Sequence, residues 1–261
     1  MLTFRILPGT TITVFGATGG TGREVVSQAL AQNYRVTVLV RDETRFRAAL
    51  PHLVRNPNLL VIKGRADNKD DVSTAMSIGQ DAVINCLGTN TRDKDVTICS
   101  RSQRCINDAM VEHHVRRLIV VTSQGLGGTD DQFNPISHLV AKTVMRKYLD
   151  DKRLQEKIVT RDAMFLDYTI VRPSTLNDGP LTEHYKVSEG AAKVVSISRA
   201  DLANFIVGEL RAGEWIGGAA TVTGYQPRRN TLTFFGPPPS RKVYEPVSED
   251  SSTSSWRSMD G

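Results

Sequence analysis

Cysteine is scarce in this sequence, with only three residues among 261. Cys86, Cys99 and Cys105 are odd in number and lack the spacing of a Cys-x-x-Cys or mixed cysteine and histidine motif. This pattern indicates neither a disulfide framework nor a zinc site, and we expect no metal. Reduced thiols of this kind are typical of a cytoplasmic protein.

Long hydrophobic runs are also missing. Residues 1–9 contain Arg5 and Pro8 and have no apolar core like that of a signal peptide. No later segment reaches the roughly 20 apolar residues that span a bilayer. We therefore expect a cytoplasmic protein that does not enter a membrane.

The excess of positive charge is small, with a formal net charge of +5 at pH 7. The basic residues are dispersed, and neither an aromatic and basic platform nor a helix-turn-helix pattern accompanies them. We therefore expect no nucleic-acid partner. The positive potential instead suits a phosphorylated cofactor. The expected partner is a small-molecule substrate.

The sequence does contain a regular alternation of Val- and Ile-rich runs with helical patterns. The expected strands are Thr11 to Phe15, Arg35 to Val40, Leu59 to Lys63, Ala82 to Leu87, Leu118 to Thr122 and Tyr168 to Val171. The expected helices are Thr21 to Gln32, Asp70 to Ser77, Val96 to His113, Pro135 to about Thr160 and Asp201 to Arg211. Such alternation predicts an α/β fold with a parallel sheet.

The length and the 39% hydrophobic content suit one domain with appendages. We expect an N-terminal extension at residues 1–9, the folded domain at 10–226 and a disordered tail at 227–261. The tail has three consecutive prolines at 237–239 and then, at 248–258, mostly Ser, Thr and acidic residues, which offer little to bury. A solvated terminus is the main interpretation, and a partner-binding segment is the alternative.

A glycine-rich turn follows the first expected strand and opens the first expected helix. Gly16 permits a tight turn, a side chain at Gly19 would collide with a pyrophosphate, and Gly22 allows the helix to pack closely on the strand. Free N–H groups and the helix dipole favour an anion at this point. The residues of the predicted dinucleotide site are Gly16, Thr18, Gly19, Gly20, Thr21 and Gly22.

The second expected strand is followed by Arg41, and Arg45 comes one helical turn later. An NAD site usually has an acidic residue here for the ribose hydroxyls, whereas a guanidinium suits the 2′-phosphate of NADP. We therefore expect NADP(H), with a merely solvated Arg41 as the alternative. Gly88 and Thr89 follow the fourth strand, where the sheet order should reverse, and are expected to line the far ribose or the nicotinamide.

Four segments carry a resemblance to a known superfamily: TVFGATGGTG at 13–22, VLVRD at 38–42, DAVI at 81–84 and DYTIVRP at 167–173. Over residues 10–226 the chain resembles the atypical short-chain dehydrogenase/reductases. Within them it is most similar to the NmrA-like group, which includes biliverdin-IXβ/flavin reductase and reductases of fungal secondary metabolism. The resemblance implies a Rossmann-type doubly wound parallel sheet and an NAD(P)H-dependent oxidoreductase.

The resemblance also implies a catalytic trio. Tyr148 and Lys152 match the Tyr-x-x-x-Lys pattern of the superfamily, and Ser123 at the end of the fifth strand matches its serine. Residues four apart share a helix face, so the ammonium can assist the phenol in protonating a substrate oxygen that the serine polarises. An accidental Tyr-x-x-x-Lys match is the alternative.

Some positions depart from the family pattern or have two interpretations. Cys105 stands where relatives have an active-site asparagine, with Asn107 two residues later, and Arg65 stands where relatives have an acid near the adenine. Arg172 ends a buried strand, where it either braces a loop or binds substrate.

The histidines differ in their expected roles. His113, His114 and His138 lie in helical patterns, and we expect none of them to be catalytic. His184 and Tyr185 follow the turn at 178–180, in a loop similar to the substrate-side loop of the NmrA-like group. They are candidates for substrate contacts, with simple solvation as the alternative.

These features together predict an NADPH-dependent oxidoreductase that reduces a carbonyl, quinone or conjugated aromatic small molecule. Two alternatives stay open. One is a dinucleotide-sensing regulator without turnover, and the other is a flavin or tetrapyrrole reductase that transfers hydride directly and needs no protein acid. The sequence leaves the oligomeric state open.

Overall fold

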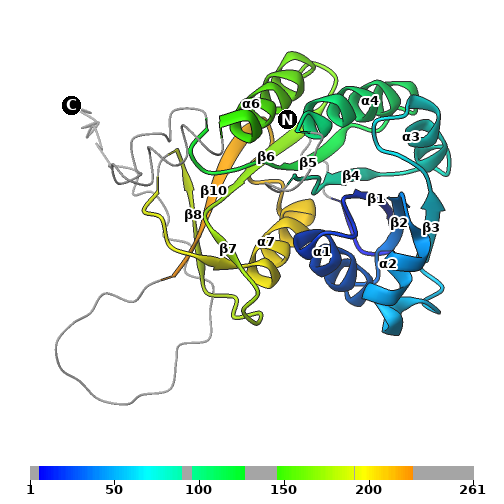
Figure 1. Cartoon of the computed structure of the whole chain (residues 1–261), viewed down its shortest axis with the longest axis horizontal. Coiled ribbons are helices and arrows are strands. Elements are labelled where there is room, and N and C mark those ends of the chain that lie inside the picture. The colour runs from blue at the N-terminus through cyan, green and yellow to red at the C-terminus, as the bar shows by residue number, and fades with distance from the viewer. Residues whose placement is uncertain (1–5, 90–95, 127–145, 191, 226–261) are drawn as a thin grey trace, which may run out of the picture. The chain divides into compact units, whose positions relative to one another are not determined.

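The computed structural model describes residues 6–89, 96–126, 146–190 and 192–225, and a sheet of eight strands runs through this part of the chain (Figure 1). Its order is β3-β2-β1-β4-β5-β6-β10-β8, and all neighbours are parallel except β10 and β8. The strands are β1 (Thr11–Phe15), β2 (Arg35–Val40), β3 (Leu59–Lys63), β4 (Ala82–Asn85), β5 (Arg117–Val121), β6 (Asp167–Pro173), β8 (Tyr185–Glu189) and β10 (Gly218–Gly224). A second sheet pairs β7 (Leu176–Asn177) with β9 (Ile197–Ser198) in parallel.

The strand order reverses between β1 and β4. From β1 the sheet grows through β2 to β3 on one side and through β4 and β5 to β6 on the other. This is the doubly wound arrangement of a Rossmann-type fold, and it confirms the predicted fold class. In such sheets a ligand binds beyond the carboxyl ends of the strands at the reversal, here at the ends of β1 and β4.

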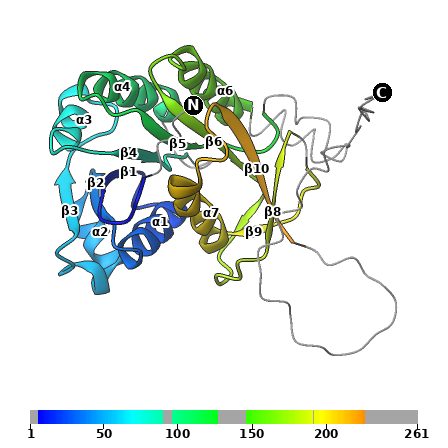
Figure 2. The ribbon, with the colours of Figure 1, turned by 180° about the vertical axis from the view of Figure 1, so that it is seen from behind.

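Helices cover both faces of the sheet (Figure 2). They are α1 (Gly20–Ala31), α2 (Glu43–Ala49), the 3-10 helix η1 (Pro51–Leu53), α3 (Lys69–Met76), α4 (Ile98–Glu112), α6 (Arg146–Arg161) and α7 (Arg199–Ala212). One core cluster contains Val25 of α1 and Ile206 of α7, and the other contains Met76, Ile106 and Val159 of α3, α4 and α6. The central strands are buried on both sides, which explains their continuous Val and Ile runs.

Three of the helices begin with a side-chain cap. Asp42 before α2, Asn68 before α3 and Ser198 before α7 each accept the backbone N–H of the residue three positions later. Such caps stabilise a helix by about 0.5–2 kcal/mol. The start of α1 differs, because its N-cap is Gly19 and no side chain caps it.

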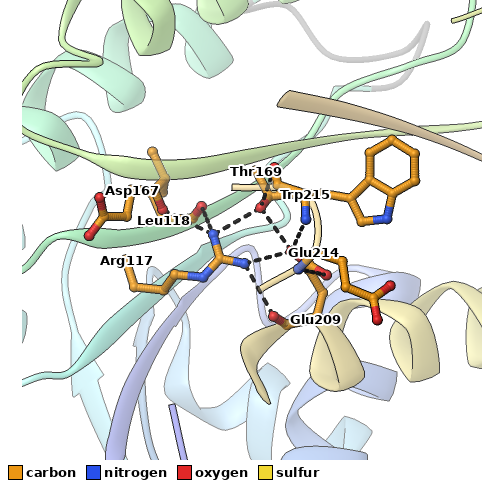
Figure 3. Close-up of polar contacts among 7 residues, drawn as sticks. All are labelled: Arg117, Leu118, Asp167, Thr169, Glu209, Glu214 and Trp215. Atoms are coloured by element: carbon orange, nitrogen blue, oxygen red, sulfur yellow. Dashed lines mark hydrogen bonds and ion pairs between the residues drawn. The ribbon is translucent and has the colours of Figure 1, made fainter. Parts of the chain in front are cut away.

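A buried ion pair joins α7 to the amino ends of β5 and β6 (Figure 3). The side chains of Arg117 and Glu209 are 2% and 1% exposed, and Nη2 lies 3.0 Å from Oε1. The carboxylate also accepts the Thr169 hydroxyl at 3.2 Å and the backbone N–H of Trp215 at 3.0 Å. Burial raises the pKa of Glu209 and lowers that of Arg117, while each charge opposes the shift of the other. The pair fixes α7 at the edge of the sheet opposite to the expected ligand edge.

Most predicted elements agree with the structure within a few residues. The structure also contains α2 and the strands β7 to β10, which the sequence did not predict. In α2 only Phe46 is buried, so the segment has no apolar periodicity to predict it. β10 begins with Gly218, Ala219 and Ala220 instead of a Val- and Ile-rich run. The first part of the helix expected from Pro135, residues 1–5 of the expected extension and the expected tail at 227–261 lie outside the described residues.

Candidate functional site

The glycine-rich turn joins the carboxyl end of β1 to α1 at the reversal of the sheet. Gly16 has a φ of +79°, and a Cβ there would lie 2.7 Å from the carbonyl carbon of Cys86, next to the end of β4. A Cβ at Gly22 would overlap the carbonyl oxygen of Gly16. Glycine is therefore required at both positions. At Gly16 the reasons are the left-handed backbone and the neighbouring strand, and at Gly22 the reason is the close contact of the helix with the turn.

The turn leaves the amino end of α1 open. No side chain caps Gly19, and the first turn of the helix has no acidic residue. The N–H groups of Gly20, Thr21 and Gly22 have no partner within the helix, because only from the fourth residue onward can a helical N–H reach a preceding carbonyl. Thr18 lies beside them and is half-buried. This cradle of backbone donors at the positive end of the helix dipole fits a pyrophosphate.

Arg41 and Arg45 lie at the carboxyl end of β2 and in the first turn of α2, and both are exposed. Neither forms an ion pair with another described residue. The nearby acid, Asp42, accepts the backbone N–H of Arg45 at 2.9 Å as the cap of α2. Its carboxylate therefore serves the helix, while both guanidinium groups are available to a phosphate.

Gly88 and Thr89 follow β4 and flank the same reversal point. Gly88 is exposed, and a Cβ there would meet nothing within 4 Å, so the backbone is open to a ligand at this position. The preceding residue, Leu87, is fixed by its N–H, which bonds to the Asn85 side chain at 3.0 Å. Its carbonyl oxygen accepts the Lys152 ammonium at 2.7 Å.

Lys152 anchors α6 to the carboxyl edge of the sheet. Besides Leu87 O, its Nζ donates to Val121 O of β5 at 2.8 Å and to the Gln155 side chain at 3.0 Å. An ammonium has three protons, and these three acceptors take all of them. The predicted position of Lys152 at the ligand edge agrees with the structure, but its partners are protein groups of β4, β5 and α6.

Ser123 and Tyr148 lie at the same edge as Lys152. Ser123 is half-buried two residues beyond β5, and its Oγ donates to the carbonyl oxygen of Gln124 at 3.0 Å. Tyr148 is half-buried in the first turn of α6, one helical turn before Lys152. Among the described residues no hydrogen bond joins members of the trio directly. The fold therefore brings them to one edge without linking them.

A second buried ion pair holds α6 against β6. Arg172 donates to Glu156 through Nε at 3.0 Å and Nη2 at 2.7 Å, and both side chains are about nine-tenths buried. The Thr122 hydroxyl after β5 donates to the same carboxylate at 2.7 Å. Arg172 thus braces the helix that carries Tyr148, which corresponds to the bracing interpretation, although the braced element is a helix and not a loop.

The side chain of Asn107 is engaged by groups of α4 and of the end of α6. Its Nδ2 donates to Asp162 at 2.8 Å and to Ile158 O at 3.3 Å, and its Oδ1 accepts the Gln103 amide at 2.8 Å. These contacts join α4 to the end of α6. Cys105 is half-buried on α4, and burial raises the pKa of its thiol.

Arg65 is paired within its own segment. It donates to Asp67 through Nε and Nη2, both at 3.0 Å, and Arg101 Nη2 lies 2.7 Å from the same carboxylate. Burial acts to raise the pKa of Asp67, but the hydrogen bond and charge of Arg65, with the charge of Arg101, lower it overall. An acid with a lowered pKa thus lies two residues beyond Arg65.

Two thiols near the site have raised pKa values. Burial raises the pKa of Cys86 to about 12, although the charge of Lys152 acts in the opposite direction. Burial also raises the pKa of Cys99, whose Sγ lies 3.7 Å from Leu87 O. Both thiols are therefore protonated at neutral pH.

Two histidines and Tyr185 have local partners. His113 Nε2 lies 2.8 Å from the Ser73 hydroxyl, and His184 Nδ1 lies 2.5 Å from Thr182 O. Tyr185 begins β8, and its hydroxyl donates to Asn204 at 2.9 Å. His138 lies outside the described residues.

Two further features near the site were not predicted. Asp151 accepts the N–H groups of Cys99 at 3.0 Å and Ser100 at 3.1 Å, and so caps α4 from α6. Arg199, at the start of α7, lies against Gly20 of the glycine-rich turn. The sequence could have pointed to Asp151 only because this residue is next to Lys152 in the Tyr-x-x-x-Lys segment. Nothing in the sequence connects Arg199 with residue 20.

Within the described ranges, neither a metal-binding cluster nor a membrane-spanning helix is present. No group of three or more His, Cys, Asp or Glu side chains there could hold a metal ion. Nor does any helix in these ranges combine the length and hydropathy needed to cross a bilayer.

Comparisons with known proteins show the family of this chain and proteins of similar sequence and fold. Residues 16–212 match the family described as NAD(P)H-binding. Reductase pytE of Aspergillus terreus is 27% identical over 258 residues, covering 82% of this chain and 97% of pytE. The anaerobillin reductase ChuY of Escherichia coli is 22% identical with a TM-score of 0.68, covering 85% of this chain and 100% of ChuY. A short-chain dehydrogenase/reductase of Veillonella parvula, solved with NADP, is 20% identical with a TM-score of 0.68, covering 82% of this chain and 94% of that one.

Proposed function

This chain belongs to the NAD(P)H-binding family, and from that premise we propose that it is an NADPH-dependent reductase of a small carbonyl, quinone or conjugated aromatic compound. The similarity to a reductase of Aspergillus terreus supports this activity. The resemblance to reductases of fungal secondary metabolism extends the proposal to a substrate of that metabolism. The observation that carries the proposal is the anchoring of α6 by Lys152 to the ends of β4 and β5. This anchoring holds Tyr148 at the edge where the glycine-rich turn lies.

The residues of the turn would hold the pyrophosphate, and Arg41 and Arg45 would bind the 2′-phosphate of NADPH. Arg41→Glu should weaken NADPH binding about 10- to 100-fold, the range expected for a lost charge-assisted hydrogen bond, and NADH binding far less. Titration followed by cofactor fluorescence measures both affinities. Arg35→Glu, at the other end of the same strand, is the matched control. Equal losses for NADPH and NADH would contradict the assignment.

The protein groups would manage the proton of the reaction. When bound, the cofactor would supply the hydride. The Tyr148 hydroxyl would donate a proton to the substrate oxygen, and Ser123, after turning from the Gln124 carbonyl, would hold that oxygen by a hydrogen bond. Lys152 is the positioning residue, because its protons hold α6 in place.

Replacement of one hydroxyl tests this assignment. Tyr148→Phe should lower turnover by about two orders of magnitude while NADPH affinity changes little. The measurement is NADPH oxidation with a panel of quinones, ketones and flavins. Tyr168→Phe is the matched control, because that hydroxyl donates to Gly217 O near the amino edge of the sheet, away from the site.

A second candidate is a reductase that transfers hydride directly to a flavin or tetrapyrrole. The observation that favours it is the saturation of Lys152, which leaves no proton for an ordered relay through this residue. Unchanged turnover in Tyr148→Phe would support direct transfer and contradict the trio. Tight NADPH binding without oxidation by any acceptor would instead indicate a dinucleotide-sensing regulator.

A further inference from the structure

The start of α7 lies beside the glycine-rich turn. α1 and α7 run side by side in both views of the ribbon (Figures 1 and 2). The Gln28 side chain of α1 donates to the carbonyl oxygen of Ala200 in the first turn of α7 at 2.9 Å. Ser198 caps α7 and fixes the backbone at this point, so the residue between Ser198 and Ala200 has a defined direction toward the turn.

That residue, Arg199, fills the space that a side chain at Gly20 would need. A Cβ on Gly20 would lie 2.5 Å from Arg199 Cδ and 2.7 Å from Nε. The stem of the arginine therefore rests on the backbone of the turn. Its guanidinium lies next to the open N–H groups at the start of α1.

The guanidinium has a weak partner. Its Nη1 lies 2.6 Å from the Asp178 carboxylate, but the Asp178 side chain is 89% exposed, against 29% for Arg199. An ion pair with a carboxylate that stays in water contributes little and is easily exchanged. Within the described part of the chain, the other N–H groups of this guanidinium have no hydrogen-bond acceptor.

We propose that Arg199 is a cofactor-binding residue, which donates charge-assisted hydrogen bonds to the cofactor pyrophosphate and releases Asp178 when the cofactor binds. The inference rests on the proposed function. A dinucleotide pyrophosphate carries two negative charges, and the helix terminus supplies only partial positive charge, so a guanidinium next to it adds the missing counter-charge. Because Asp178 follows β7 in the substrate-side loop, the exchange connects cofactor binding with that loop.

Binding measurements on the full-length protein test the proposal without a substrate. NADPH, NADH, ADP and adenosine 2′-monophosphate are titrated into the wild type, Arg199→Gln, Asp178→Asn and Arg35→Gln. Arg35 is an exposed arginine at the amino end of β2, so its variant controls for loss of one positive charge. The melting temperature of each variant, compared with that of the wild type, tests whether the fold is intact.

Arg199→Gln should weaken NADPH, NADH and ADP by a similar factor of about 10 to 100, and leave adenosine 2′-monophosphate unaffected. Asp178→Asn should bind NADPH at least as tightly as the wild type, because the competing carboxylate is gone. A loss confined to NADPH, a loss matched by Arg35→Gln, or weaker binding in Asp178→Asn would overturn the inference. Failure of the wild type to bind any dinucleotide would overturn the proposed function itself. If the protein binds NADPH but shows no turnover, the ratios of variant to wild-type affinity still decide for or against the role of Arg199.

Discussion

Two buried arginine–glutamate pairs lie at opposite edges of the sheet, and they allow stability to be separated from activity. Arg117 and Glu209 join α7 to the amino ends of β5 and β6, whereas Arg172 and Glu156 join β6 to α6 at the carboxyl edge. Glu209→Gln and Glu156→Gln each keep the side-chain shape and remove one charge. We predict that both variants destabilise the fold and that only Glu156→Gln slows turnover.

The size of each loss follows from burial. Leaving one charge of a buried pair without its partner costs about 3–5 kcal/mol. The Arg117 side chain is only 2% exposed, so water cannot solvate its charge in Glu209→Gln, and that loss should lie at the upper limit. The Arg172 side chain is 11% exposed, so Glu156→Gln should lie at the lower limit. Since a folded domain has about 5–15 kcal/mol in total, both losses are measurable.

Urea titration followed by circular dichroism gives the free energy of unfolding, and NADPH oxidation well below the unfolding midpoint gives turnover of the folded protein. Glu156→Gln should slow turnover because Glu156 anchors the helix that carries Tyr148. An unfolding free energy of Glu209→Gln equal to that of the wild type would refute the burial argument. An equal loss of turnover in the two variants would refute the placement of the site at the carboxyl edge.

Two further predictions concern the turn and acid stability. Gly22→Ala should abolish dinucleotide binding and lower the melting temperature, because its Cβ would overlap the Gly16 carbonyl oxygen. Calorimetry measures both effects. The control is Gly208→Ala in the interior of α7, where a Cβ meets nothing, and this variant should be about 0.5–1 kcal/mol more stable than the wild type. The hydrogen bond from Arg161 lowers the pKa of Asp162 below its ordinary value of 3.8. The ionised Asp162 therefore stabilises the folded state fully above pH 3.8, and this contribution is lost as the pH falls through the lower pKa of the folded state. Asp162→Asn should therefore be less stable than the wild type at neutral pH and equal to it in strong acid; urea titrations that show a pH-independent difference would contradict this.

Local sequence patterns were sufficient to predict the centre of the fold. Strands covered by helices on both faces need apolar residues at every position, so β1, β2 and β4 appear in the sequence as short continuous runs. The glycine-rich turn was equally predictable, because Gly16 and Gly22 are required by contacts within the turn and with the adjacent strand. The edge elements were not, since β8 and β10 depend on pairing across the sheet and not on an apolar period.

The polar contacts of the site could be predicted only in part. The spacing of Tyr148 and Lys152 correctly indicates one helix face at the carboxyl edge. The three acceptors of Lys152 could not be anticipated, because two of them are backbone carbonyls 65 and 31 residues away in the sequence. The contact of Arg199 with Gly20 likewise arises from the packing of α7 on α1, which no local pattern encodes.

The packing of α7 on α1 also has a consequence for the order in which the protein can fold. The hydrogen bond from Gln28 to Ala200 spans 172 positions, and Ile6 N donates to Leu210 O at 2.9 Å. The first helix is therefore completed by an element that is synthesised much later. Contacts of such long range slow folding. On the ribosome, the N-terminal glycine-rich turn therefore emerges early but obtains its neighbour only after residue 212 has been added. A chain shortened before that point should fail to retain a dinucleotide, even though it contains every glycine of the turn.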